Sequence, residues 1–175
     1  MNHSVRAVDR IAPRRQGNWD WRAAGNFVAG GAGGGVLACV AALSIGLGFD
    51  PRLLLAVGLA MMGFGLTCVW FEIGRPWRAM NVFRHVGSSW MTREAYVALF
   101  AMGTGLLAIG LGTRPLVAAT GLLGLLFIYA QARILAANKG ITARRHGRCL
   151  PVVLSNGLAE GAGAVACAGA WAARW

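Results

Sequence analysis

The sequence has few charged residues. Only 13% of its 175 residues are charged, whereas a soluble globular domain carries about 25%. Hydrophobic residues make up 57% of the chain, and most charges lie between long apolar runs. This composition excludes an ordinary soluble domain. A net charge of +11 can indicate nucleic-acid binding, but membrane topology explains basic residues in this arrangement better. We therefore expect no nucleic-acid partner.

Histidine is absent from the apolar runs. His3, His85 and His146 lie in the polar tail and in connections. A b-type haem inside a helix bundle normally takes two axial histidines from the helices. We therefore expect no haem in this chain. A histidine near water can still transfer protons, so His85 is a candidate for that role.

Closely spaced cysteines are also absent. Cys39, Cys68, Cys149 and Cys167 lie far apart in the sequence. This spacing excludes a CxxC set of ligands for zinc or for an iron–sulfur cluster. We expect structural thiols, with no iron–sulfur cluster and no metal site in this chain.

The N-terminal segment lacks the features of a signal peptide. Residues 1–24 are polar and rich in arginine, and they contain neither a short apolar stretch nor a small-residue cleavage site. We predict a basic cytoplasmic tail over residues 1–24, followed by a transmembrane domain over residues 25–175.

Five apolar runs reach or nearly reach the roughly 20 residues that a spanning helix needs. We expect spans at 27–49, 53–71, 94–113, 115–135 and 150–173. The predicted fold is an all-α integral membrane protein, a bundle of five transmembrane helices. A short interfacial helix, at about 79–85, is expected between the second and third spans.

Glycine is frequent in all five spans. Small residues allow the backbones of neighbouring helices to approach closely in lipid. We expect the glycine-rich segment 30–35 to serve tight helix packing. The alternative is room for a flat ligand against the backbone.

The basic residues lie mostly on one side of the predicted bundle. All but three of the 17 occupy the tail or the second and fourth connections, which five spans place on the same side. The exceptions are Arg52, Arg114 and Arg174. Lysine and arginine near span ends mark the cytoplasmic side. We therefore expect the bacterial inner membrane, with the N-terminus cytoplasmic and the C-terminus periplasmic.

The second connection is the most distinctive part of the chain. Glu72 and Glu94 flank it, with Arg75 and Arg93 near them in sequence. One interpretation makes the carboxylates proton acceptors or hydrogen-bond partners of a bound quinol. The other makes them structural ion pairs that hold the connection. Both interpretations fit the sequence.

Two polar residues inside the later spans also need an explanation. Glu160 lies near the middle of the fifth span, one helical turn after Asn156. An ionisable residue at that depth usually marks a functional or interhelical site, and the alternative is a protonated carboxyl bonded to a neighbouring helix. Gln131, at the end of the fourth span, can bond across helices. Beside it, Arg133 can extend its side chain to the cytoplasmic surface.

Several motifs resemble a known family. Gly-Arg-Pro-Trp-Arg-Ala at 74–79 and Ser-Trp-Met-Thr-Arg-Glu at 89–94 resemble the membrane-anchor subunit of dimethyl sulfoxide reductase and the wider polysulfide-reductase membrane-subunit family. The segments that begin at Asn26, Ala132 and Gly157 are similar to parts of the same anchors. The likeness covers most of the chain after the tail.

This resemblance implies a partner complex. Anchors of the family sit under an iron–sulfur electron-transfer subunit, which contacts a molybdenum- or tungsten-pterin catalytic subunit. They bind menaquinone or ubiquinone near that docking face and carry no haem. Family anchors have more than five spans. They also often place a histidine where this chain has Glu72, so here a carboxylate would serve as the quinol ligand.

The sequence therefore predicts a quinone-binding membrane anchor, a non-catalytic subunit of a multi-subunit oxidoreductase. Its alternatives are a purely structural anchor and a small proton-coupled transporter that uses Glu160. The residues expected to line or border the quinone headgroup are Asn26, Glu72, Arg75, Trp77, Trp90, Arg93 and Glu94. Trp77 or Trp90 would stack on the ring. The residues expected to transfer protons or to bond between helices are Glu160, Gln131 and His85.

Overall fold

The computed structural model of the chain describes residues 21–72, 87, 89–137 and 147–172, with Glu72 and Ala172 described by their backbone alone. Within these ranges the fold is all-helical. Five helical segments there are long and apolar enough to cross a membrane. Their length and composition support a multi-pass membrane protein.

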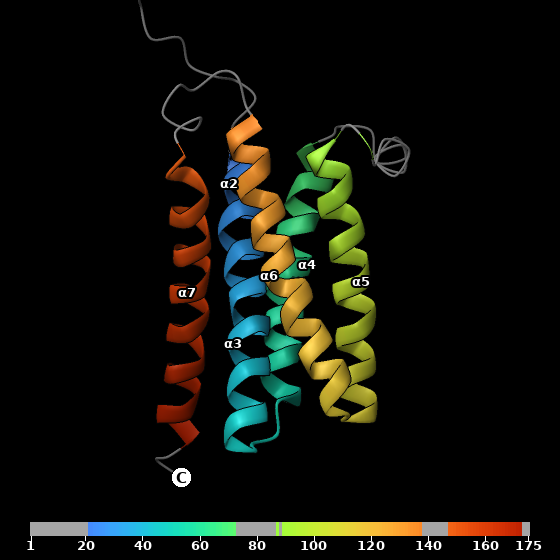
Figure 1. The fold of residues 1–175 in the computed structure, drawn as a ribbon, viewed down its shortest axis with the longest axis vertical. Helices are drawn as coiled ribbons and strands as arrows, with labels where there is room; N and C mark the ends of the chain where they lie inside the picture. The colour runs from blue at the N-terminus through green and yellow to red at the C-terminus, as the bar shows by residue number, and fades with distance from the viewer. Residues whose placement is uncertain (1–20, 73–86, 88, 138–146, 173–175) are drawn as a thin grey trace, which may run out of the picture.

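The first span is built from three consecutive elements: α2 (Trp21–Gly25), the π-helical turn η1 (Asn26–Gly30) and α3 (Gly31–Leu47). The other spans are α4 (Arg52–Glu72), α5 (Trp90–Leu111), α6 (Arg114–Ala137) and α7 (Cys149–Ala172). The helices stand side by side, with α7 and α5 on the two flanks and α3, α4 and α6 between them (Figure 1).

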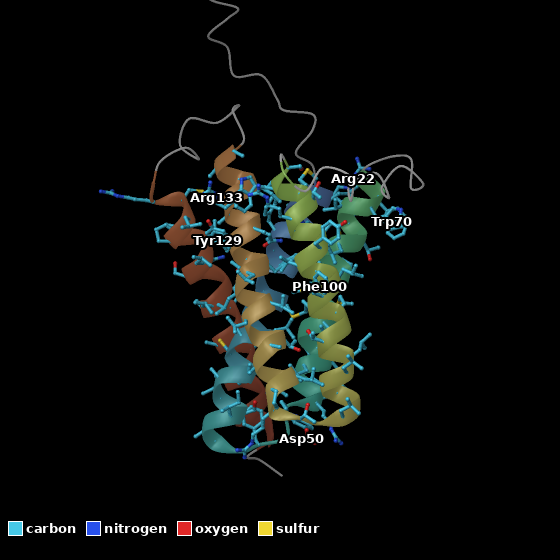
Figure 2. The ribbon with its side chains drawn as sticks, turned by 45° about the vertical axis from the view of Figure 1, so that its right-hand side comes forward. Arg22, Asp50, Trp70, Phe100, Tyr129 and Arg133 are labelled. Carbon is cyan, nitrogen blue, oxygen red and sulfur yellow. The ribbon has the colours of Figure 1, made fainter. Side chains whose placement is uncertain are left out.

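One end of the bundle carries most of the described arginines. The starts of α2, α5 and α7 meet the ends of α4 and α6 there (Figure 1). Arg22 and Arg133 lie at this end, whereas Asp50 lies at the other (Figure 2). Arg93 is in the first turn of α5, and Arg148 directly precedes α7. We call this end the basic end.

Local sequence signals set several helix ends. Ser89 precedes α5 with extended backbone, and its hydroxyl accepts a hydrogen bond from the Thr92 amide at 3.4 Å, which is the usual N-cap arrangement. Asp50 accepts a bond from the Arg52 amide at 3.1 Å at the start of α4. Gly48 and Gly112 end α3 and α5 with φ of 74° and 66°. Glycine adopts such left-handed backbone without a steric cost.

Three consecutive glycines of α3 contact three different helices. A Cβ added to Gly33 would lie 2.7 Å from the Gly58 carbonyl oxygen of α4, and one added to Gly34 would lie 2.9 Å from the Gly124 carbonyl oxygen of α6. A Cβ on Gly35 would overlap the Gly157 carbonyl of α7. Successive side-chain positions on a helix are about 100° apart, so the three neighbours surround α3. The expected use of this segment, tight packing, is what the structure shows.

Large apolar side chains on the outside of the bundle match a lipid environment. Phe64, Phe100, Leu106 and Leu111 are each more than half exposed. Such a surface would be a liability in water, but it suits hydrocarbon, which is as apolar as a protein core.

The observed helices extend beyond the predicted apolar spans at the basic end. The first span begins at Trp21 instead of 27, and α5 begins at Trp90 instead of 94. The expected boundary of the tail at residue 24 therefore falls inside a helix. At α5, the Ser89 cap starts the helix before the apolar run begins. The predicted interfacial helix at 79–85 lies outside the described residues.

Candidate functional site

Three polar side chains from three helical elements meet inside the bundle near the basic end. Asn26 comes from η1, Glu94 from the second turn of α5, and Gln131 from the last third of α6. Their exposed fractions are 3%, 6% and 0%. We call this group the amide–carboxyl cluster.

Hydrogen bonds join the members of the cluster. The Asn26 amide nitrogen Nδ2 donates to Glu94 Oε1 at 3.4 Å. Gln131 Nε2 donates to the backbone oxygen of Asn26 at 3.0 Å. The expected bond of Gln131 across helices is thus confirmed. The hydrogen-bond partner of the Glu94 carboxyl is the Asn26 amide, which comes from another helical element.

The cluster offers more acceptors than donors. A buried carboxyl group is costly unless other groups hydrogen-bond to it, and here the Asn26 amide does so. The side-chain oxygens Asn26 Oδ1 and Gln131 Oε1 are buried and have no hydrogen-bond partner among the described residues. Buried acceptors without donors are uncommon in native structures. A hydroxyl donor brought by a ligand would satisfy them.

A wider helical turn sets the position of Asn26. The turn η1, Asn26–Gly30, is π-helical and interrupts an otherwise α-helical span. Single π turns inside α-helices occur frequently at functional sites. At its start, the Asn26 carbonyl accepts the Gln131 amide, so a side chain of another helix supplies a donor to the backbone there. Such compensation is what an irregular turn in lipid requires.

Glycines provide the space for the two amides. A Cβ on Gly30 would lie 2.9 Å from Gln131 Nε2 and 3.4 Å from Asn26 Oδ1. A Cβ on Gly31 would lie 3.2 Å from Gln131 Oε1, and one on Gly65 would lie 2.8 Å from the Gly30 nitrogen. The glycine-rich segment therefore also shapes this site.

A group of aromatic and cationic side chains surrounds Trp90, one helical turn before Glu94 on α5. The guanidinium carbons of Arg93 and Arg133 lie 4.4 and 4.6 Å from the Trp90 ring centroid. Tyr129 packs edge-on against the same ring, with centroids 5.8 Å apart. Arg133 and Tyr129 lie together near the basic end (Figure 2). We call these four residues the Trp90 group.

The Trp90 group borders a cavity. A hollow of about 320 Å³ lies between the start of α5, the end of α6 and the start of α7. Its lining includes Trp90, Arg133, Ala136, Cys149 and Leu150.

Several expected site residues are placed differently from the simplest prediction. Trp90 was expected to stack on a quinone ring, but two guanidinium groups already contact it, so a flat ring would have to replace one of them. Arg93 was expected near a carboxylate, and this pairing stays a prediction; the described contact of its side chain is a hydrogen bond to the Gly87 carbonyl at 2.9 Å. The side chain of Glu72 and the residues Arg75, Trp77 and His85 lie outside the described part of the chain.

Tyr129 was not among the residues predicted for this site. The contact of the Arg133 guanidinium with the Trp90 ring was not predicted either. Tyr129 is one of only two tyrosines in the chain, and it lies one helical turn before Arg133 on α6. That spacing is a signal, because residues four apart share a helix face.

Glu160 does not join the amide–carboxyl cluster. It lies on α7 and accepts a hydrogen bond from Asn156 Nδ2 at 2.9 Å, which confirms that the two share a face. Asn156 is exposed and Glu160 partly so. The pair thus lies on the outer side of the flanking helix, and Glu160 bonds within its own helix.

A second cavity lies at the opposite end of the bundle. It measures about 390 Å³ and is lined by residues of the α3–α4 and α5–α6 connections. Asp50 and Arg52 form an exposed ion pair there, with Oδ1 and Nε 3.9 Å apart. None of the predicted site residues that the structure describes borders this cavity.

Comparisons with known proteins add no relative to this picture. No protein-family model matches the chain, and no curated protein or solved structure matches it. The function is therefore inferred from the motifs and from the geometry of the described residues.

Proposed function

We propose that this chain is the quinone-binding membrane anchor of a multi-subunit oxidoreductase of the molybdenum or tungsten type. The amide–carboxyl cluster is the observation that carries the proposal. It places one carboxyl group, Glu94, beside two acceptor oxygens inside the bundle near the basic end. The motif around 89–94, which resembles the family of such anchors, includes this same glutamate.

The cluster suits the chemistry of a quinol. A bound quinone supplies two-electron redox chemistry, which is coupled to two protons. Glu94 would accept or return one proton at its carboxyl oxygens, because a carboxyl within hydrogen-bond reach is an effective acid or base. Asn26 and Gln131 would hold that carboxyl in place, and their orphan oxygens would accept hydroxyl donors. The Trp90 group would cover the cluster on the side of the basic end.

The basic end suits a partner that delivers electrons. Arg22, Arg93, Arg133 and Arg148 lie there, and opposite charges guide and orient docking. The proposed partners are an iron–sulfur subunit and a molybdenum- or tungsten-pterin catalytic subunit. The proposed location is the bacterial inner membrane, with the basic end in the cytoplasm. Glu160 lies on the outer side of α7, a position that gives no support to a transporter with a proton path through the bundle.

The test compares two electron routes in membranes that contain the complete complex. Glu94→Gln keeps the shape of the side chain but removes its proton exchange. We expect quinone-linked turnover to fall by about 10²-fold or more, the lower end of the contribution of a positioned acid or base. Turnover with a soluble dye, which reacts at the catalytic subunit, should remain unchanged. Glu94→Asp, which keeps the carboxyl, should recover part of the quinone-linked rate.

Asp50→Asn is the matched control, because it makes the same chemical change in the exposed ion pair at the other end of the bundle. It should leave both rates unchanged. If Glu94→Gln retains full quinone-linked turnover, the proposed role is wrong. If Glu94→Gln instead prevents the complex from assembling, the purely structural anchor is the better description.

A further inference from the structure

The outer face of α7 is the least covered surface of the bundle. Within the most apolar window of each span, 17% of the residues of α7 are buried, compared with 67% for the first span. The inward contacts of α7 run along Gly157, Gly161 and Val165, which are its buried residues. Figure 1 shows α7 on one flank of the bundle, beside α3.

A polar pair lies at the edge of this uncovered face, with Asn156 exposed and Glu160 partly exposed. Asn156 donates to Glu160 at 2.9 Å, and Glu160 is the twelfth of the 24 residues of α7. At 1.5 Å per residue, it lies roughly 16 Å into the helix, about halfway across a hydrocarbon core of roughly 30 Å. Ionisable residues at that depth normally face protein or water rather than lipid. The pair therefore calls for another polypeptide against this face.

Small residues make the same face accessible to a second helix. Ser155, Ala159, Gly163 and Cys167 follow one another at intervals of four residues, and all four are exposed. A Cβ added to Gly163 would meet nothing within 4 Å, so this glycine has no packing role within the described chain. Small residues at this interval let two membrane helices approach closely.

We propose that the outer face of α7 binds the same face of a second copy of this chain. The hydrogen-bonding groups of the polar pair are self-complementary. Beyond the bond to Glu160, the Asn156 amide has a second N–H and a carbonyl oxygen, and Glu160 has a second oxygen. A covering group must therefore offer both a donor and an acceptor. A second copy related by a two-fold axis along the membrane normal presents both at the same depth.

This interface is independent of the proposed function, because the pair lies on a different helix from the amide–carboxyl cluster. In the dimer, Asn156 and Glu160 gain hydrogen-bond partners, and Gly163 gains a contact with the other copy. The resulting dimer has α7 at its centre and the amide–carboxyl clusters away from the contact.

The test measures association of the full chain in lipid vesicles at decreasing protein density, by energy transfer between labelled copies. Gly163→Ile should prevent close approach and abolish the dimer. Asn156→Leu is present in both copies of the dimer, so two symmetry-related hydrogen bonds are lost, and their combined loss should weaken association about 5- to 30-fold. The matched control is Gly103→Ile on α5. This glycine is also exposed and would also place a Cβ in open space, and its replacement should leave association unchanged.

Cys167 gives a second readout in native membranes. It is exposed on the same face, one turn after Gly163, so a short thiol cross-linker should join two copies through it, and Cys167→Ser should remove the product. A monomer at every density, equal weakening by Gly163→Ile and Gly103→Ile, or a Cys167 product that contains a different polypeptide would each overturn the proposal. Circular dichroism checks that the variants remain folded.

Discussion

The contact between α3 and α7 provides the sharpest stability prediction, for the substitution Gly35→Ala. A Cβ on Gly35 overlaps the backbone carbonyl of Gly157, and a Cβ on Gly161 overlaps the backbone of Gly35. Backbone atoms on both sides cannot turn away as a side chain can. The substitution therefore requires α7 to move away from α3 or to leave the bundle.

The size of the effect follows from the depth of this overlap. At Gly33, a Cβ would lie 2.7 Å from the Gly58 oxygen, inside the 3.4 Å at which ordinary contact begins, and the overlap at Gly35 is deeper. Overpacking typically costs about 1–3 kcal/mol, so the upper end applies here. Alanine recovers about 1 kcal/mol through its higher helix propensity. We expect a net loss of about 2 kcal/mol in the free energy of unfolding.

Equilibrium unfolding in mixed micelles with increasing dodecyl sulfate, followed by circular dichroism, measures this difference. Gly103→Ala is the matched control, because its Cβ would meet nothing within 4 Å, and it should be neutral or slightly stabilising. If Gly35→Ala unfolds at the same detergent fraction as Gly103→Ala, then α7 does not pack against α3 as described.

Two further predictions concern the site. Gln131→Leu should lower the free energy of unfolding by about 1–3 kcal/mol, because the buried Asn26 carbonyl loses a donor. In the same unfolding assay, Thr120→Val should lower it clearly less, because the hydroxyl that it removes is bonded mainly within its own helix. Equal effects of the two substitutions would argue against the cluster. Trp90→Leu should lower the free energy of unfolding by about 1–3 kcal/mol, because two cation–π contacts and one aromatic contact are lost. In a double-mutant cycle with Arg133→Gln, the two effects should be non-additive. Strict additivity would mean that the two side chains do not interact.

Hydropathy was sufficient to predict the helices but not their rotation. The five spans follow from apolar runs whose backbone must satisfy its own hydrogen bonds in lipid. Lipid is as apolar as the bundle interior, so the spans lack the polar outer stripe by which a soluble helix reveals its buried face. The sequence therefore placed Glu160 near the middle of the fifth helix, but it did not show on which side of α7 this side chain lies.

The sequence indicated Asn26, Glu94 and Gln131 as separate candidates, but it did not predict that the three meet. Asn26 and Glu94 are 68 residues apart, and Asn26 and Gln131 are 105 apart. Their meeting depends on helix rotation and on the π-helical turn, and neither has a local signal in the sequence. The expected arginine partners of the carboxylates rested on sequence proximity alone. In the structure, the carboxyl group of Glu94 is turned into the bundle, and Arg93, its neighbour in sequence, is at the Trp90 ring.

The turn η1 sets the rotation of the first part of the first span. A π-helical turn contains one residue more than the α-helical turn that it replaces, so the extra residue is absorbed within the turn. If residues 26–30 formed a regular α-helix instead, every residue before them would swing by about 100° around the helix axis, and Asn26 would point away from Glu94. Deletion of a single residue there, such as Val28, would remove the extra residue together with the wide turn, and the residues before it would keep their orientation. The wide turn thus decides whether the first span presents its amide to the carboxyl or to another side.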